Sequence, residues 1–456
     1  MELHGRRVIY TEQNVIDRNN VLDVLNKSLQ THNLNKDEIE YLYTYYKGDQ
    51  PILKRVKDVR PEINNKIVEN RANEIVTFKV GYLVGEPIQY VSRSGGENIT
   101  DALNEFNEFV YSENKALKDK EIAEWFTIGG TAYRIALPNV RYALGESPFK
   151  MYTLDPRSSF VVYTNDYSHR PIMGVSYVRK DNHEIYTVYT ENKRFTITDN
   201  KIIDEVNHIL GRVPIIEYPA NSARLGAFEI VIPLLDAINT VSSNRIDGVE
   251  QFVQALMMFK GVDIEDKQFQ SLKELGAMKV PVDGDVKYLI QELNQTQTQT
   301  LVDDMYQTVL TICGMPNRNG GTSTSDTGSA VIMRDGWSAA EARAKDTEVM
   351  FKRSEKEFLK LLLEITNTLA FMNLELPQVE IRFTRRNYEN ILEKVQVLTM
   401  MVDNPNIANK LGFQYSGMFA DPELAYSESV KEAAENARRK EAELQNLMKS
   451  QVPDDV

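Results

Sequence analysis

The sequence has little of what disulfide-bonded, metal-binding or membrane proteins depend on. Its 456 residues include one cysteine, Cys313, which excludes an intrachain disulfide and a multi-cysteine metal site. We expect Cys313 to be a small buried apolar residue. No apolar run reaches the ~20 residues that a membrane helix needs, and the first residues contain no signal-peptide core. We therefore expect a soluble chain with no membrane partner, in the reducing cytoplasm of the cell that makes it.

Recognisable catalytic motifs are also missing. The stretch Asn319 to Ser323 is rich in glycine, but no G-x-x-x-x-G-K-[ST] occurs, so there is no Walker A phosphate cradle. No HExxH or G-x-S-x-G is present, and the histidines lack metal-ligand spacing: His4, His32, His169, His183 and His208. Asp303 and Asp304 would point about 100° apart on a helix, which disfavours a shared metal ion. The sequence thus predicts no catalytic residue, no metal site and no cofactor.

Positive charge is in deficit. The chain has 53 Lys and Arg residues against 66 Asp and Glu, a formal net charge of -13. Because nonspecific DNA affinity comes mainly from Lys and Arg, this argues against a protein that grips phosphates, although DNA could still pass nearby. Acids are interleaved with the basic clusters, which are interpreted as solvated faces or ion pairs between subunits. The clusters are Lys54, Arg55, Lys57 and Arg60; Arg382, Arg385 and Arg386; and Arg438, Arg439 and Lys440.

The N-terminal half combines helical and extended patterns. An amphipathic stretch from Val21 leads to a tyrosine cluster that Lys47-Gly48-Asp49 ends, and Asn64 to Val84 suggests a helix running into an extended segment. Residues 88–92 alternate like a strand. Short runs rich in Val, Ile, Thr, Tyr and Phe then predict an antiparallel or mixed sheet with helices packed on it. These runs are 131–137, 149–154, 159–163, 172–178, 184–190 and 194–198.

The C-terminal half is mainly helical. Residues 228–253 form a helical pattern with an apolar side and a polar side. The polar side carries Asn239, Ser242, Ser243, Asn244, Arg245 and Asp247. A compact α/β insertion at 258–293 ends in a strand-like run at 286–290, and a QTQTQT stretch leads into a helix ending at Cys313. A seam from Trp337 to Met372 predicts a helix of thirty-five residues or more, roughly 50 Å long. One strand at 378–383 and helices broken at Asn404-Pro405 follow, the last beginning at Asp421-Pro422.

Several segments, taken in order, resemble the portal proteins of long-tailed phages of Gram-positive hosts. The most specific are YYKG at 45–48, NNKIVEN at 64–70 and FKVGYLVGEPI at 78–88. Others are GGTAY at 129–133, VPIIEY at 213–218, FEI at 228–230, LLDAIN at 234–239 and DTGSA at 326–330. They are spread over about residues 40 to 375 and therefore cover most of the chain.

The resemblance implies an α+β portal fold with an α/β wing, a two-helix stem, a clip inserted between the stem helices, a long wing helix and a helical crown. Applied to this sequence, it gives a wing at 1–226, a stem helix at 227–257, a clip at 258–294, a second stem helix at 295–316, a tunnel loop at 317–336, the long wing helix and returning strand at 337–388, and a crown and tail at 389–456.

The function implied is that of a ring of identical subunits, by resemblance a dodecamer, at one capsid vertex of the virion. Double-stranded DNA would pass through its channel during packaging and ejection. The terminase large subunit and then a head-completion adaptor protein would dock on it, with major capsid and scaffolding proteins as further partners during assembly in the host cytoplasm. Two alternatives remain open: another phage assembly protein of capsid or scaffold type, and a metal-dependent nucleic-acid enzyme.

Two segments are expected to contact partners. The first is a polar loop at the start of the expected tunnel loop. It carries little apolar area and only one cation, so it should touch DNA weakly if it lines the channel. The alternative is that it is a solvent-exposed connector outside the wing. Its residues are Asn317, Arg318, Asn319, Gly320, Gly321, Thr322, Ser323, Thr324, Ser325, Asp326 and Thr327. In the clip, the expected partner-binding residues are Lys260, Asp263, Glu265, Asp266, Lys267, Lys273, Glu274 and Lys279.

Overall fold

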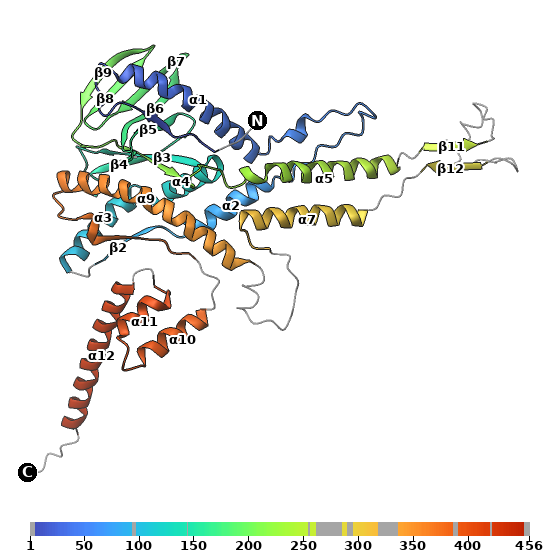
Figure 1. Cartoon of the computed structure of the whole chain (residues 1–456). Helices are drawn as coiled ribbons and strands as arrows, with labels where there is room; N and C mark the ends of the chain where they lie inside the picture. The colour runs from blue at the N-terminus through green and yellow to red at the C-terminus, as the bar shows by residue number, and fades with distance from the viewer. Residues whose placement is uncertain are drawn as a thin grey trace, which may run out of the picture. The chain divides into compact units, whose positions relative to one another are not determined.

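A computed structural model describes residues 5–93, 97–143, 145–253, 256–260, 285–289, 295–317, 336–385, 391–419 and 422–450. The chain divides into two compact units (Figure 1). Unit 1 comprises Met1–Tyr43, Glu74–Ile230 and Gly314–Val456, and unit 2 comprises Thr44–Asn73 and Val231–Cys313. Both helices and strands are present in quantity, as the α+β prediction requires.

A six-stranded mixed sheet lies in unit 1, in the order β1-β5-β6-β7-β8-β9. β1 (Ile9–Thr11) pairs parallel to β5, whereas the other neighbours are antiparallel. Helix α1 (Val21–Tyr46) packs on this sheet because Val21, Val24 and Leu25 share a buried apolar cluster with strand residues. The other strands are β5 (Ser159–Thr164), β6 (Pro171–Lys180), β7 (His183–Tyr189), β8 (Lys193–Thr198) and β9 (Lys201–Asn207).

The strands expected between residues 131 and 198 belong to two sheets rather than to a single one. The second is antiparallel, in the order β10-β3-β4, with β3 (Thr131–Pro138), β4 (Phe149–Leu154) and β10 (Ile215–Pro219). Helices α4 (Lys115–Gly129) and α9 (Trp337–Leu369) pack against it. Gly130 ends α4 with a φ of 80°, and a β-carbon there would lie 1.9 Å from the carbonyl oxygen of Arg224. The close approach therefore requires glycine at this corner.

The predicted order of elements between Asn64 and Val84 is wrong. Residues 64–70 are not helical, and helix α2 (Arg71–Val84) follows them. The strand expected next is confirmed as β2 (Gln89–Ser92), which pairs antiparallel with β13 (Val379–Arg382). Helix α3 (Glu97–Ser112) follows β2 and contacts it. The chain thus joins its N-terminal and C-terminal parts through a two-stranded sheet.

The C-terminal region is helical, with a break at Asn404-Pro405 and a last helix that begins at Pro422, as predicted. Its helices are α10 (Ile391–Val402), α11 (Asn409–Ser416) and α12 (Pro422–Ser450). α11 contacts both neighbours, and the ring of Phe413 lies 5.1 Å from that of Phe419 and 5.6 Å from that of Tyr426. The described part of α12 beyond its first turns is exposed, so little apolar burial supports it.

A buried ionic cluster holds α9 against the second sheet. Glu355 is fully buried, and its carboxylate lies 2.8 Å from Lys115 Nζ and 3.5 Å from an Arg134 nitrogen. Asp119 in turn contacts Lys115 at 2.5 Å and Arg134 at 2.6 Å, which balances the two cations. The hydroxyl groups of Tyr90 and Tyr218 donate to Glu355 at 2.6 and 2.7 Å. The cluster is therefore charge-balanced and heavily hydrogen-bonded, as buried charges must be.

Candidate functional site

Unit 2 is built around two long helices, α5 (Ile232–Val253) and α7 (Gln295–Cys313), which lie side by side (Figure 1). Both were predicted, although α5 begins after a short 3-10 turn at Glu229–Val231 and α7 already includes the QTQTQT stretch. Arg245 of α5 hydrogen-bonds to Gln299 of α7. Cys313 is buried at the end of α7, as expected.

The polar side of α5 binds the extended segment 65–69. The backbone N–H of Asn65 donates to Asp247 Oδ1 at 2.7 Å, that of Ile67 to Ser243 Oγ at 2.9 Å, and that of Glu69 to Asn239 Oδ1 at 3.0 Å. All three acceptor residues are buried. We call these three hydrogen bonds the 65–69 ladder. The polar side that the sequence predicted therefore has a partner within the same chain.

The ladder works because two repeats have nearly the same length. In an extended chain the N–H groups alternate in direction, so every second N–H points the same way, and two such groups are about 6.6 Å apart. Every fourth residue of an α-helix advances by about 6 Å along nearly the same face. Positions 247, 243 and 239 can therefore accept from positions 65, 67 and 69 in turn, with the two segments antiparallel. The side chains of α5 thus supply the hydrogen-bond acceptors that a neighbouring strand would supply in a sheet.

A charged clasp ends the ladder at Asp247, whose side chain is only 3% exposed. Arg55 lies 2.9 Å from its carboxylate, and Lys57 also forms an ion pair with it. Burial raises the pKa of the Asp247 carboxyl, but hydrogen bonds from Lys57 and Asn65 outweigh it and hold that pKa below its usual value. Asp247 is therefore an ionised acceptor for segment 55–65.

Within the described residues, several members of the basic clusters form ion pairs inside this chain, whereas Lys54 forms none. Besides Arg55 and Lys57, Arg385 lies 3.0 Å from Glu341 and 2.7 Å from Glu348 on α9. Arg439 lies 3.9 Å from Glu435 along the exposed helix α12. The sequence predicted solvated faces or ion pairs between subunits, whereas Arg55, Lys57 and Arg385 form ion pairs within this chain.

The insertion between α5 and α7 begins and ends on a two-stranded antiparallel sheet. β11 (Leu256–Lys260) pairs with β12 (Asp285–Leu289), with Leu256 opposite Leu289 and Lys260 opposite Asp285. The insertion thus leaves and rejoins the unit at one place. Lys260 is the last residue of β11, whereas the other predicted clip residues lie outside the described residues: Asp263, Glu265, Asp266, Lys267, Lys273, Glu274 and Lys279.

The polar loop also begins and ends at one place. Gly336, with a φ of 82°, begins α9, and a β-carbon on it would lie 3.7 Å from the Cα of Pro316. Trp337 lies beside two aromatic rings, at 6.1 Å from both Phe78 and Tyr82. Asn317 is half-buried at the start of the loop, and the predicted DNA-facing residues Arg318 to Thr327 lie outside the described residues. The flanks of this loop are therefore brought together on a packed base.

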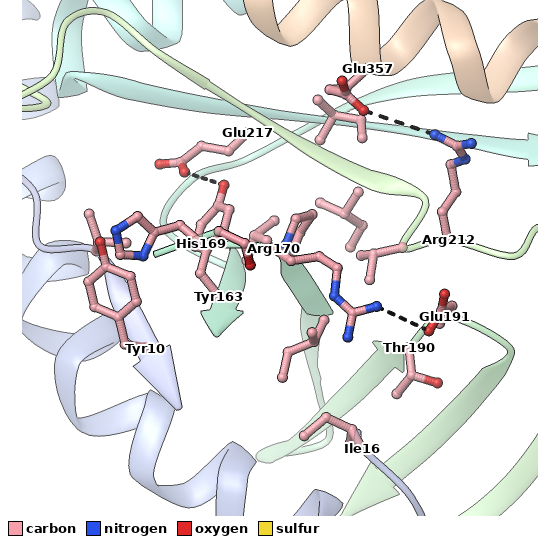
Figure 2. A pocket seen from close by; sticks show the side chains of 18 of the residues that line it. Tyr10, Ile16, Tyr163, His169, Arg170, Thr190, Glu191, Arg212, Glu217 and Glu357 are labelled. Carbon is pink, nitrogen blue, oxygen red and sulfur yellow. Dashed lines mark hydrogen bonds and ion pairs between the residues drawn. The ribbon is translucent and has the colours of Figure 1, made fainter. Parts of the chain in front are cut away.

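A cavity of about 900 Å³ in unit 1 lies between the six-stranded sheet and α9. Figure 2 shows three pairs among its polar groups: Arg170 lies 3.7 Å from Glu191, Arg212 lies 4.0 Å from Glu357, and Tyr163 donates to Glu217 at 2.7 Å. Sequence reasoning did not identify this cavity, because its lining comes from strands and loops far apart in the sequence. Because these paired groups bind one another, they are not free to converge on a ligand.

Among the described residues, no helix is long and apolar enough to cross a membrane, and no three His, Cys, Asp or Glu side chains gather as metal ligands. The chain belongs to the phage portal protein family described as SPP1 Gp6-like, which residues 25–445 match. The members of this family are structural components, the head-tail connectors of phages.

One phage protein and two solved chains are similar to this chain. The chain is 22% identical to the portal protein of Bacillus phage SPP1 over 442 residues, which cover 90% of this chain and 84% of that one. Two chains of solved structures are each 12% identical to the present chain. One comes from the neck of an empty GTA particle computed with C6 symmetry. Its TM-score is 0.49, and the match covers 84% of this chain and 94% of that one. The other comes from the neck of a native GTA particle computed with C12 symmetry. Its TM-score is 0.42, and the match covers 76% of this chain and 89% of that one.

Proposed function

We propose that this portal protein assembles into a closed ring, by family resemblance a dodecamer, at one vertex of the phage head, and that DNA passes through the ring. In this proposal α5 and α7 are the stem, the segment between β11 and β12 is the clip, 317–336 is the tunnel loop, α9 belongs to the wing, and α10 to α12 form the crown. The terminase large subunit and later a head-completion adaptor dock at the clip, and capsid and scaffolding proteins surround the ring.

The observation that carries the proposal is the placement of the two insertions. Each leaves and returns at one point, at Leu256 and Leu289 for one and at Pro316 and Gly336 for the other. Partner contacts can therefore vary in these segments without disturbing the helices that carry them. The net charge of -13 suits a conduit, because B-DNA carries one negative charge per ~1.7 Å and attractive contacts would slow it.

The purified protein should form rings without DNA or nucleotide, because the contacts of a closed ring lie between its own subunits. Mass photometry at physiological salt should show one high-mass species, and negative-stain images should show particles with a central hole. Monomers alone would contradict the proposal, shells would favour a capsid or scaffold protein, and a Mg²⁺-dependent nuclease activity would favour the enzyme alternative.

Two variants of the ring should separate the functions of its two insertions. Replacing residues 261–284 with a short linker should abolish terminase binding while rings persist. Thr322→Lys with Ser325→Lys should leave ring size and terminase binding intact but slow packaging at low salt, because added cations attract the duplex and salt screens that attraction.

Terminase pull-down and packaging rate are measured on both variants. Terminase binding to the shortened ring would remove the clip assignment, and an unchanged packaging rate at low salt in the lysine variant would remove the tunnel-loop assignment. Ring formation by both variants is the control that each subunit is folded.

A further inference from the structure

Unit 2 has three layers, with α5 in the middle. Arg245 lies two positions from both Ser243 and Asp247, and two residues of a helix point about 160° apart. The 65–69 ladder binds Ser243 and Asp247, whereas Arg245 contacts Gln299 of α7. The extended segment and α7 therefore cover opposite faces of α5, and Figure 1 shows them on opposite sides of it.

The outer layer on the segment side is basic and partly apolar. We call five of its exposed residues the basic edge: Leu53, Lys54, Val56, Val59 and Lys66. Exposed Asp58 lies among them, and exposed Glu62 pairs with Arg60 at 3.2 Å. Val56 is 83% exposed and Val59 is 79% exposed, which is unusual for two valines only three residues apart. Lys66 donates to the carbonyl oxygen of Leu53 at 2.8 Å, so Lys54 and Lys66 lie in the same part of this surface. Neither lysine has an ion pair among the described residues.

The outer layer on the α7 side is acidic and also partly apolar. Leu301, Asp304 and Ile312 are exposed on the side of α7 away from Gln299, whereas Asp303 is exposed on the flank next to Gln299. We call these four residues the acidic edge. Asp303 accepts a hydrogen bond of 2.7 Å from Gln299, a neutral donor, and neither Asp303 nor Asp304 has an ion pair within the part of the chain that the structure describes. Both negative charges thus remain available to a cationic partner.

We propose that the basic edge of one subunit binds the acidic edge of the next copy of this chain. This rests on the proposed ring. A ring needs a heterologous contact between two different surfaces of the same subunit, and unit 2 carries complementary surfaces on its two opposite outer layers. The exposed apolar residues of each edge become buried in the contact, and the charges around them fix its register. The ladder and clasp hold the basic edge in place.

Charge reversal tests this contact. Lys54→Glu with Lys66→Glu on the basic edge, or Asp303→Lys with Asp304→Lys on the acidic edge, should raise the protein concentration needed for half-maximal ring formation at least about tenfold at low salt. The effect should shrink as salt rises. Each variant should keep the parent's circular dichroism and melting temperature as a monomer, because all four side chains are exposed.

Recombination of the charges gives a sharper result. The chain that carries all four substitutions should form rings again, because both edges are exchanged. An equimolar mixture of the two double variants should also assemble, because the reversed basic edge of one then meets the reversed acidic edge of the other while the remaining contacts keep their native charges. Native mass spectrometry of that mixture should show rings with equal numbers of the two chains.

The outcomes separate this inference from the ring itself. A parent protein that forms no rings removes both proposals. Parent rings, together with normal assembly of both charge-reversed variants at low salt, remove only the edge-to-edge contact. Normal assembly of the Lys54/Lys66 variant with weakened binding to a short DNA duplex would assign the basic edge to DNA instead. Loss of assembly that neither the four-substitution chain nor the mixture restores would also overturn the pairing.

Discussion

Glu355→Ala should lower the free energy of unfolding by about 3–5 kcal/mol, because it removes one partner from a buried, charge-balanced cluster. Burial raises the pKa of the Glu355 carboxyl, but Lys115 and Arg134 outweigh it and hold that pKa well below its usual value. Without Glu355, the cations of Lys115 and Arg134 share only Asp119, and the hydroxyl groups of Tyr90 and Tyr218 lose their acceptor.

Urea denaturation at a fixed protein concentration measures this loss. Glu357→Ala is the matched control, because this glutamate lies on the same helix but is half exposed, and its replacement should change stability by no more than about 0.5 kcal/mol. Glu355→Gln keeps the shape and one acceptor oxygen, so its cost should fall between the two. Equal stability of the Glu355→Ala and Glu357→Ala variants would show that the cluster does not hold α9.

The seam of α9 was predictable because a regular repeat reports burial. Phe351, Ser354 and Phe358 recur at steps of three and four and are all buried. Glu355 lies on the same buried side, yet its charge gave no sign of this. Its partners come from α4, β3, β2 and β10, which are far apart in the sequence, so only the folded chain brings them together.

Strands were predicted where turns bound them and one face is apolar. β9 was missed because it is an edge strand with no fully buried residue, so the alternation that marks a half-buried strand is weak. β1 has only three residues, too few to show any alternation. β10 lies within the VPIIEY motif and was not predicted as a strand, although Ile215 and Tyr218 are buried in the second sheet.

The reversed order between Asn64 and Val84 has a tertiary cause. Ile67 and Val68 suggest a helix by their spacing from later apolar residues, but the backbone N–H groups of residues 65, 67 and 69 are taken by side chains of α5. Sequence patterns locate apolar faces and do not report which distant acceptor a backbone group will find. The same limit applies to the polar side of α5, whose residues were identified while their partner was not.

Asp247→Ala should lower the free energy of unfolding by about 2–4 kcal/mol, because the Asn65 N–H loses its acceptor and two partly buried cations lose their counter-ion. Ser243→Ala removes one neutral acceptor of the same ladder, and its cost should be about 1 kcal/mol. Glu250→Ala, an exposed acid on the same helix, should be neutral within about 0.5 kcal/mol. Hydrogen exchange should localise the change: in the Asp247 variant the amides of Asn65 and Ile67 should exchange faster, while those of β5 and β6 keep their protection.

The pH dependence of the same variants identifies the charge as the cause. The folded-state pKa of Asp247 is lower than the unfolded-state value, so its contribution is fully present above the unfolded pKa and is lost as pH falls through the folded one. Between pH 7 and pH 3 the parent should therefore lose more stability than Asp247→Asn, which has no carboxyl to titrate, whereas Glu250→Ala should follow the parent. Parallel pH profiles for the parent and Asp247→Asn, together with unchanged exchange at residues 65–69, would mean that the clasp does not hold the extended segment on α5.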